Sequence, residues 1–491
     1  MNLKSLAKDT AIYGLSSIVG RFLNYLLVPL YTYKISAESG GYGIVSNLYA
    51  WSALLFALLT FGMETTFFRF ANKEEEDQKM VYSNALRMVG GVGLVFVALV
   101  LALLGPISGA MGYADHPEYI ACFAVIGALD AFQAIMFGRL RQQHRPMKFM
   151  CLKMSFIVLN ILMNLFIFLA MPKIPALAGI YSRFNEGVGL IFFANLLCTA
   201  SVTFGFIPEL KGITYGFDRA LAGRMLKYSW PLLLLSLVGI LNQVADKILF
   251  PWLMPGEEGM VQLGIYGACV KIAMIMSLLT QAFRYAYEPI VFGGSKDRNS
   301  PEMLAQGMKY FIIFTLLAFL AVMVYMPILR HFVDSGYWAG LDVIPVVMMA
   351  EIFMGIYFNL SFWYKLTDQT WWGAIMSAIG TAVMISINII FVPKIGYWAC
   401  AWGGFAGYGV AMLLSWFIGQ KRYPIPYDLK TTGFYAGLAA VLFILSQLPD
   451  WMGWEIANWA RIAAGTVLLG IFCCPIILSF LKSRRNKSIA K

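Results

Sequence analysis

The chain has few charged residues, and this scarcity excludes a water-soluble fold. Asp, Glu, Lys and Arg make up 13% of its 491 residues, whereas 60% are hydrophobic and the mean hydropathy is +0.70. A soluble globular domain carries about 25% charged residues. The apolar runs are roughly 18 to 27 residues long, which is enough for a helix to cross a hydrocarbon core of ~30 Å. We therefore predict an all-α integral membrane protein.

Cysteine, histidine and long loops are also scarce. The seven cysteines lie in or beside apolar runs without a CxxC spacing, and the three histidines are far apart. We expect neither a disulfide framework nor a metal site, and no cofactor. The loops on the predicted outer side are too short for a catalytic domain. The net charge of +11 is spread over many short loops. This dispersal favours attraction to lipid headgroups and argues against nucleic-acid binding.

The apolar runs predict fourteen transmembrane helices. Lys4 and Lys8 precede the first run, as in a signal sequence, but its length and the absence of a cleavage site indicate a retained helix. With a cytoplasmic N-terminus, only five basic residues fall outside: Lys34, Lys173, Arg183, Arg330 and Lys394. The positive-inside rule therefore places both termini in the cytoplasm. The predicted spans are 10–33, 43–70, 81–104, 118–138, 150–171, 187–206, 229–253, 264–291, 309–330, 342–364, 371–392, 397–419, 431–449 and 460–481.

Matched sequence marks indicate a duplicated half. Tyr42-Gly43 is followed by Glu64 twenty-one residues after the glycine, and Tyr266-Gly267 is followed by Glu288 at the same distance. Asn164 and Pro172-Lys173-Ile174 recur as Asn388 and Pro393-Lys394-Ile395, so the offset is about 221 to 224 positions. We expect six-helix lobes over residues 1–210 and 211–428 and two further helices in 429–491. Tyr228-Ser229-Trp230-Pro231 and Arg422-Tyr423-Pro424-Ile425-Pro426 resemble junctions between these parts.

Charged side chains inside the spans are the candidate functional residues, because each costs at least about 2.5 kcal/mol to insert. Arg21 lies near the middle of the first span, with Asn24 on the same helical face. A guanidinium there could bind phosphate oxygens in a bidentate manner, and the alternative is a structural pair with an acid on a neighbouring helix. Lys271 and Arg284 of the eighth span are further substrate-binding candidates. Asp130 and Glu351 are lone acids, which more often join helices.

Four more residues are candidates for a gate or for coupling: Glu64, Arg69, Asp246 and Glu288. We expect Glu64 to meet Arg284 between the lobes in the outward-open state only. The alternative is a permanent local pair between Arg284 and Glu288, which stand at i and i+4. Asp246 and Lys247 are adjacent in sequence and splay by about 100°, so they are not expected to satisfy each other. Pro289 is expected to break the helix after Glu288.

Two stretches carry a family resemblance. The first stretch runs from Gly20-Arg21-Phe22-Leu23-Asn24 through Pro29-Leu30-Tyr31-Thr32. The second is Asn388-Ile389-Ile390-Phe391-Val392-Pro393-Lys394-Ile395-Gly396. They resemble the Wzx-type flippases of the multidrug/oligosaccharidyl-lipid/polysaccharide superfamily. The resemblance implies two six-helix lobes around a central cavity and an alternating-access mechanism. Related lipid II flippases keep essential arginines in helices one and eight, which correspond here to Arg21 and to Arg284 or Lys271. The extra helix pair favours the lipid-linked-sugar branch over the drug exporters.

The resemblance implies a transporter and not an enzyme. Its substrate would be a polyprenyl-diphosphate-linked oligosaccharide, moved from the cytoplasmic to the periplasmic leaflet of the bacterial inner membrane. Membrane lipids are expected partners, and a polysaccharide polymerase is a candidate partner. Coupling to protons, sodium or the membrane potential stays open. The alternatives are a lipid II flippase and a cation-coupled drug exporter. A polysaccharide polymerase or glycosyltransferase is disfavoured because the first outer loop carries only Glu38.

Overall fold

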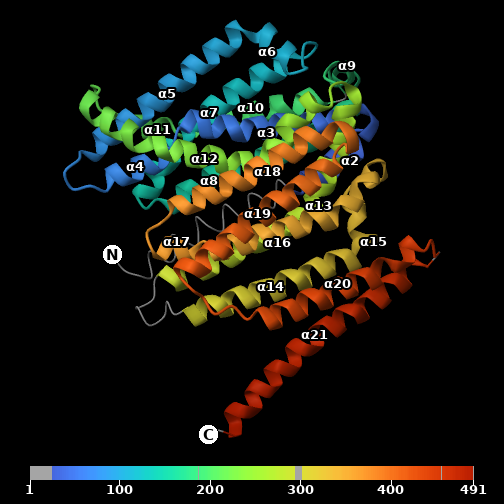
Figure 1. Cartoon of the computed structure of the whole chain (residues 1–491). Coiled ribbons are helices and arrows are strands. Elements are labelled where there is room, and N and C mark those ends of the chain that lie inside the picture. Colours follow the sequence, from blue (N-terminus) through green and yellow to red (C-terminus); the bar gives the residue numbers. More distant parts are fainter. Residues whose placement is uncertain (1–24, 186, 293–300, 455, 490–491) are drawn as a thin grey trace. The chain divides into compact units, whose positions relative to one another are not determined.

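A computed structural model describes residues 25–185, 187–292, 301–454 and 456–489 of the chain. Over these ranges the chain is helical and contains no β-strand (Figure 1). It divides into two compact units, Met1–Gly267 and Ala268–Lys491. The boundary falls inside one long helix, α13, which runs from Glu257 to Phe292. The predicted all-α class is confirmed.

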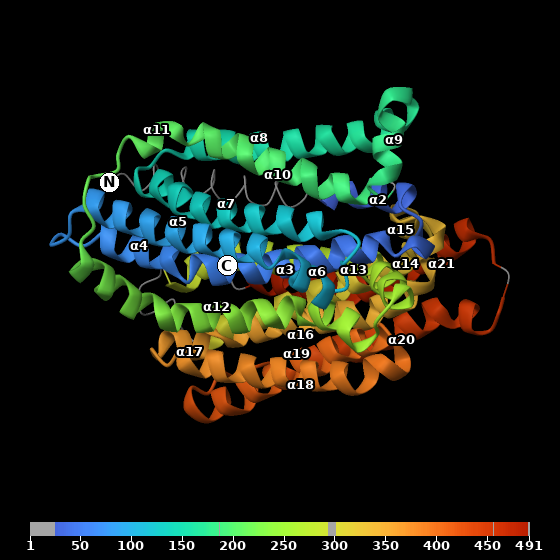
Figure 2. The ribbon, with the colours of Figure 1, turned by 90° about the horizontal axis from the view of Figure 1, so that it is seen from above.

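The first unit is built from the helices that precede α13. Their bounds are α2 Leu27–Lys34, α3 Gly41–Thr60, α4 Met63–Ala71, α5 Gln78–Ala102, α6 Leu104–Ala110, α7 Pro117–Gln142, α8 Pro146–Leu165, α9 Pro175–Arg183, α10 Val188–Gly205, α11 Ile207–Leu210 and α12 Arg219–Leu253. A π-helical turn at Phe166–Ala170 and 3-10 turns at Ala37–Ser39 and Met171–Lys173 complete it. Within this unit α7 packs against α5, α10 and α3, and α12 packs against α3 (Figure 2).

The second unit continues from α13. Its helices are α14 Pro301–Val324, α15 Met326–Leu329, α16 Ile344–Leu360, α17 Phe362–Leu366, α18 Trp371–Ile395, α19 Trp398–Arg422, α20 Leu429–Trp451 and α21 Asn458–Ile489, with 3-10 turns at Arg330–Phe332 and Ser335–Val343. In this unit α19 packs against α18 and α16, and α14 packs against α20 and α21. The stretch 422–426 lies at the connection between α19, which ends at Arg422, and α20, which begins at Leu429. Its role as a boundary between a lobe and an appendix stays a prediction.

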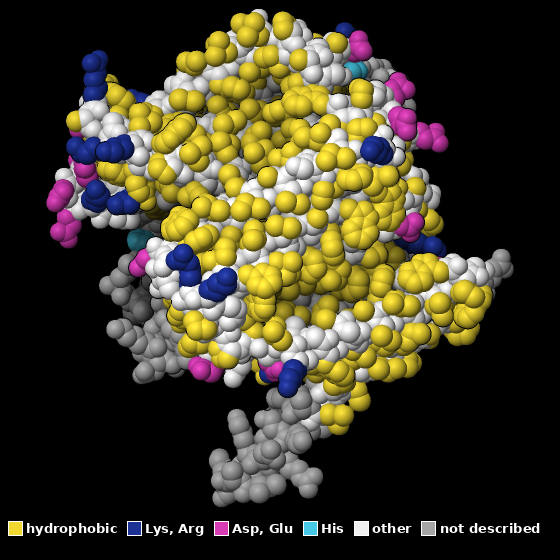
Figure 3. Space-filling view, viewed as in Figure 1, with side chains coloured by type: hydrophobic (Ala, Val, Ile, Leu, Met, Phe, Trp, Pro, Cys, Tyr) yellow, Lys and Arg dark blue, Asp and Glu magenta, His cyan; other side chains and the backbone are white. Residues whose placement is uncertain are grey.

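Thirteen helical segments of the described chain are long and apolar enough to cross a membrane. They correspond one to one to the predicted spans from 43–70 through 460–481. The predicted first span, 10–33, lies mostly outside the described residues. Figure 3 shows that hydrophobic side chains cover most of the surface in view. The protein is therefore a multi-pass membrane protein.

Local chemistry explains where several helices begin. The Asp218 carboxylate caps α12 by accepting from the backbone N–H groups of Ala220 and Leu221 at 2.9 and 3.0 Å. Asp77 caps α5 in the same manner through Lys79 N–H at 3.0 Å. These side chains satisfy N–H groups that the first helical turn leaves unpaired. Pro117 and Pro146 occupy the first turns of α7 and α8, where a missing N–H is harmless.

The predicted span 43–70 is interrupted. Phe61 and Gly62 adopt left-handed conformations, with φ of 35° and 71°, between α3 and α4. A Cβ on Gly62 would lie 2.9 Å from the Leu232 Cβ and 3.0 Å from the Ser229 carbonyl oxygen. Glycine therefore allows both the backbone turn and the close contact with α12. The break places Glu64 in the first turn of α4, where the helix dipole favours an acid.

Two expectations based on proline are wrong. The stretch Tyr228-Ser229-Trp230-Pro231 is no junction, because α12 continues through Pro231 and also through Pro251. Pro289 does not end its helix, because α13 continues to Phe292. A proline removes one hydrogen bond, which membrane helices tolerate when neighbouring groups satisfy the freed carbonyl. The predicted lobes 1–210 and 211–428 and the appendix 429–491 concern duplication and transport, and they stay a prediction.

Candidate functional site

The first two predicted substrate ligands, Arg21 and Asn24, lie outside the described residues. Their proposed role therefore stays a prediction. The described residues offer another cation within a span, Lys153 on α8. It stands about 10 Å along the helix from Pro146, which is seven residues of 1.5 Å rise. Its side chain is exposed.

Lys153 lies on the face of α8 that packs against protein. Phe149, Ile157, Asn160 and Asn164 are all buried, and with Lys153 they form one helical stripe spaced by three or four residues. The lipid-facing residues of α8, such as Val158 and Leu162, lie on the opposite side. Lys153 is thus the accessible member of an otherwise buried stripe. A cation in this position is available to a ligand that reaches the inner face of the helix.

The surroundings of Lys153 are ionisable and aromatic. Its ammonium group lies 4.4 Å from the ring centre of Phe137 on α7. It interacts electrostatically with Asp130, Glu64 and Arg141. Asp130, Phe137 and Arg141 are spaced by seven and four residues and share one face of α7. Among the described residues, no carboxylate oxygen lies within 4.0 Å of the Lys153 nitrogen. Lys153 therefore has no ion-pair partner in direct contact there.

Glu64 pairs with Arg141 and so joins α4 to α7. The Arg141 guanidinium also lies 4.9 Å from the ring centre of Phe68, and its Nε is buried without a hydrogen-bond partner. Arg69, one turn further along α4, stacks over the Tyr228 ring at 4.2 Å. Breaking the single Glu64 contact would leave Arg141 and Lys153 as two available cations in one region. This arrangement suits an anionic ligand with several oxygens.

Asp246 lies in the first unit, and both of its carboxylate oxygens accept hydrogen bonds. The Lys247 ammonium donates to both of its carboxylate oxygens, at 3.0 and 2.9 Å, and the Tyr266 hydroxyl donates to one at 3.0 Å. The expectation that Asp246 and Lys247 cannot satisfy each other is wrong. The flexible four-carbon chain of lysine folds back across the angle between neighbouring positions. The Asn47 side chain of α3 donates to the Lys247 carbonyl oxygen at 2.7 Å and so joins α3 to α12 beside this cluster.

In the second unit, Glu288 accepts from two cations. Arg284 Nη2 and Lys365 Nζ each lie 3.3 Å from its Oε1. The local pair that the sequence offered as an alternative is therefore present, and Lys365 of α17 extends it. Arg284 also lies 4.6 Å from the Phe358 ring centre. Lys271, on the same helix, is half-buried. The predicted gate between Glu64 and Arg284 in the outward-open state stays a prediction.

Sequence reasoning missed Lys153, Arg141 and Lys365 as site candidates. Arg141 and Lys365 lie at span ends, so they read as ordinary members of basic loops. Lys153 had a usable signal, because it shares a helical face with Asn160 and Asn164 in the predicted span 150–171. A stripe of polar residues within an apolar run indicates a face turned away from lipid.

Comparison with known proteins establishes the family. The family model described as "Polysaccharide biosynthesis protein" matches residues 6–289. The chain belongs to this polysaccharide biosynthesis protein family. The match covers more than half of the chain and includes α3 to α12 and nearly all of α13. A search of curated protein sequences finds no match.

Solved structures show the fold of this family member. The lipid II flippase MurJ in an inward closed conformation has a TM-score of 0.74 and 15% identity, covering 97% of this chain and 100% of that chain. An inward-facing MATE-family multidrug resistance transporter of the MOP superfamily has a TM-score of 0.60 and 16% identity, and the match covers 84% of this chain and 94% of that chain. The outward-facing conformation of a MATE-family multidrug resistance transporter of the MOP superfamily has a TM-score of 0.56 and 15% identity, and the match covers 84% of this chain and 95% of that chain. These similarities show that the chain has the same helical membrane fold as these transporters.

The first unit also holds a buried acid. Glu209 of α11 is 5% exposed and receives Arg145 Nη1 at 2.9 Å and Lys148 Nζ at 2.6 Å. Burial by itself raises the pKa of Glu209. The hydrogen bond to Lys148 and the charges of Lys148, Arg145 and Arg139 lower the pKa by a larger amount, so the net shift is downward. This carboxylate ties the start of α8 to the segment after α10.

The Glu209 cluster predicts a defined pH dependence. A lowered folded-state pKa contributes stability that is present above the ordinary value of 4.5 and is lost as pH falls through the folded-state pKa. We expect Glu209→Gln to lower thermal stability at neutral pH, by about 1 to 3 kcal/mol. The deficit relative to the parent should shrink below pH 4.5. Melting of both purified proteins between pH 3 and 7 tests this, with Glu74→Gln in an exposed loop as the control. A deficit of constant size at every pH would contradict it.

Proposed function

We propose that the chain moves a polyprenyl-diphosphate-linked oligosaccharide from the cytoplasmic to the periplasmic leaflet of the bacterial inner membrane. Membership of the polysaccharide biosynthesis protein family supports a role in assembling surface glycans. The fold shared with the lipid II flippase MurJ supports a lipid-linked substrate. The substrate class fits a repeat unit of O-antigen, capsule or exopolysaccharide.

The observation that carries the proposal is the accessible cation on the protein-facing side of α8. A diphosphate carries its charge on several oxygens, and it must cross a hydrocarbon core that excludes ions. Lys153, and Arg141 once released from Glu64, would supply donors to those oxygens. Arg21, Asn24, Lys271 and Arg284 are proposed as further ligands. In this proposal the protein changes no covalent bond.

The acids would couple substrate binding to the conformational change of the transporter. Glu64 occupies Arg141 when no substrate is bound, so substrate oxygens and the Glu64 carboxylate compete for one guanidinium. A competition of this kind couples substrate binding to a change of ion pairs, and a coupling of about 1 to 3 kcal/mol is typical. Arg69, Asp246 and Glu288 are proposed as the other gate or coupling residues. Protons, sodium and the membrane potential are the candidate driving forces.

Deleting the encoding gene in its native host tests the function. We expect loss of surface polysaccharide and accumulation of the polyprenyl-diphosphate-linked repeat unit in the cytoplasmic leaflet. The parent gene on a plasmid should restore export. Leaflet position can be read by treating intact spheroplasts with a membrane-impermeant glycosidase or lectin and then extracting the lipid-linked sugar.

Other outcomes identify the alternatives. Arrest of peptidoglycan synthesis with accumulated lipid II would indicate a lipid II flippase. Unchanged glycans with increased sensitivity to cationic drugs would indicate a drug exporter. Repeat units that reach the outer leaflet but are not joined would indicate a polymerase. Each of these results would overturn the proposal.

A further inference from the structure

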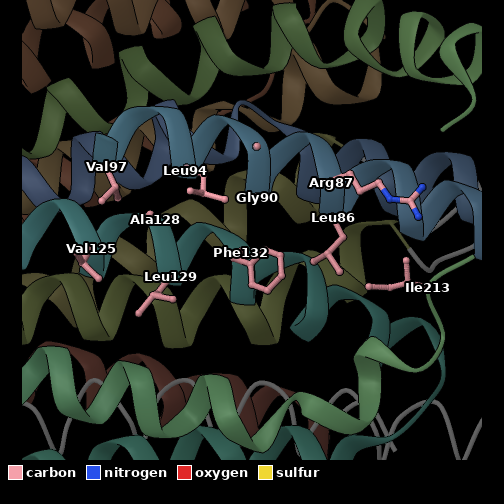
Figure 4. A pocket seen from close by; sticks show the side chains of 12 residues that line it. Leu86, Arg87, Gly90, Leu94, Val97, Val125, Ala128, Leu129, Phe132 and Ile213 are labelled. Carbon is pink, nitrogen blue, oxygen red and sulfur yellow. The ribbon is translucent and has the colours of Figure 1, made fainter. Parts of the chain in front are cut away.

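An apolar groove runs between α5 and α7 in the first unit, away from the residues assigned above. It has a volume of about 510 Å³. Its walls come from the two helices and from Ile213 (Figure 4): Leu86, Arg87, Gly90, Gly91, Gly93, Leu94, Val97, Val125, Ala128, Leu129 and Phe132. Arg87 is the one charged side chain among them, and it lies with Ile213 at one end of the groove.

Glycine gives the groove its depth. Gly93 meets Ala128 so closely that a Cβ would lie 3.3 Å from the alanine methyl group, which brings the two helices together. A Cβ on Gly91 would meet no atom within 4 Å, so the helix surface is open at this position. The bordering residue Leu94 is 74% exposed. A leucine with most of its surface exposed in a membrane span faces lipid, and the groove therefore opens toward the hydrocarbon.

The groove has the length of one leaflet. From Arg87 to Val97 the helix rises about 15 Å, which is half of a ~30 Å hydrocarbon core. The chain carries no charge from Met88 to Ala114, so Arg87 marks the level at which the apolar part of the span begins. Beside it, Tyr215 is fully exposed and Phe217 is 46% exposed. Exposed aromatic residues of this kind gather at the level of lipid headgroups.

Arg87 lacks an acidic partner among the described residues. One guanidinium nitrogen donates to the Thr214 carbonyl oxygen, and Nη1 is buried without a hydrogen-bond partner. No carboxylate of the described chain lies within 4.0 Å of its nitrogens. A buried donor without a partner is costly, and a guanidinium matches phosphate geometry well. A phosphate at this end would satisfy the charge while its chain follows the apolar walls.

We propose that this groove binds one anionic glycerophospholipid of the surrounding membrane. Arg87 binds the phosphate at the headgroup level, and one acyl chain lies along Gly90, Gly91 and Gly93. The lipid fills the space between α5 and α7 and stabilises the first unit from its lipid-facing side. The site is separate from the residues proposed to bind the transport substrate, because neither Lys153 nor Arg141 lines the groove.

Native mass spectrometry of the purified full chain tests the site with two probes that share acyl chains, phosphatidylglycerol and phosphatidylcholine. We expect the parent to bind one phosphatidylglycerol about fivefold more tightly, the size expected for one cation near an anionic headgroup. Arg87→Gln should remove the preference but keep binding. Gly91→Leu should remove binding of both lipids, because its side chain occupies the groove without a clash. Gly105→Leu is the matched control, since it also meets open space but does not line the groove.

Three results would overturn the proposal. The parent could bind both phospholipids equally, or Gly91→Leu could retain the bound lipid as Gly105→Leu does. Undecaprenyl phosphate could also displace phosphatidylglycerol from the parent while phosphatidylglycerol fails to displace it, which would assign the groove to a polyprenyl carrier. Arg87→Gln and Gly91→Leu act on different parts of the site, so misfolding of one leaves the other informative.

Discussion

Lys153→Glu is expected to abolish export of the lipid-linked oligosaccharide while the protein stays in the membrane at its normal level. Reversing the charge places a carboxylate where the proposed diphosphate binds, near Asp130 and Glu64. Lys153→Ala should reduce export roughly ten- to hundredfold, because a hydrogen bond to a charged group is worth about 1.5 to 3 kcal/mol. Lys153→Arg keeps the charge and should retain most of the activity. Surface polysaccharide in a deletion strain carrying each variant gives the measurement.

The control for this series is Lys79→Glu, which reverses an exposed lysine at the start of α5. It should export like the parent, which separates the position of the charge from the net charge of the chain. A structural role for Lys153 predicts a different pattern, in which every substitution lowers the amount of folded protein. Export by Lys153→Glu at the level of the parent would contradict the proposed phosphate contact. The gene-deletion phenotype tests the substrate class separately.

Gly43→Ala is expected to prevent stable folding of the first unit. A Cβ at this position would lie 2.0 Å from the Met260 carbonyl oxygen, at the crossing of α3 with the first turns of α13. The clash is with backbone, so no side-chain rotation relieves it, and we expect a loss of about 3 kcal/mol. The facing Gly264 is also closely packed, with a Cβ position 3.0 Å from the Gly43 nitrogen. Purified protein should show a lower melting temperature and much lower yield.

Gly239→Ala is the matched control for this substitution. Gly239 lies inside α12, and a Cβ there meets no atom within 4 Å. Alanine should leave the melting temperature unchanged or raise it, since glycine is the poorer helix former by about 0.5 to 1 kcal/mol. Equal melting temperatures for Gly43→Ala and Gly239→Ala would show that the two helices do not approach as closely as the structure indicates.

The residues that match between the two predicted halves lie at closely packed positions of the structure. Gly43 and Gly267, which match in the two halves, both lie where α3 meets α13, and a Cβ on Gly267 would reach 2.4 Å from the Ser46 hydroxyl. Asn164 and Asn388 are matched too, and both are completely buried, in α8 and α18. The prolines differ, because Pro172 lies in a 3-10 turn that follows α8 and its π-helical turn, whereas α18 continues through Pro393. The small and polar marks thus correspond to packing positions.

The existence of the membrane helices was determined by the sequence alone. Thirteen predicted spans coincide with helices that cover almost all of each span, because moving an apolar run into hydrocarbon depends on its own composition and length. The family resemblance was also readable, since it rests on residues of the chain. Proline misled the prediction at Pro231 and Pro289, because its effect depends on whether neighbouring groups satisfy the freed carbonyl.

Only the tertiary structure decided which charges meet. Glu64 pairs with Arg141, which is 77 residues away, and Glu288 receives Lys365 in addition to its local neighbour Arg284. It also decided that Lys153 is accessible on a buried stripe and that Gly90, Gly91 and Gly93 leave a groove. Hydropathy is a sum over one segment and can be read along the chain. Ion pairs and grooves depend on which helices become neighbours and on their rotation about their axes, and these are set by packing between segments far apart in sequence.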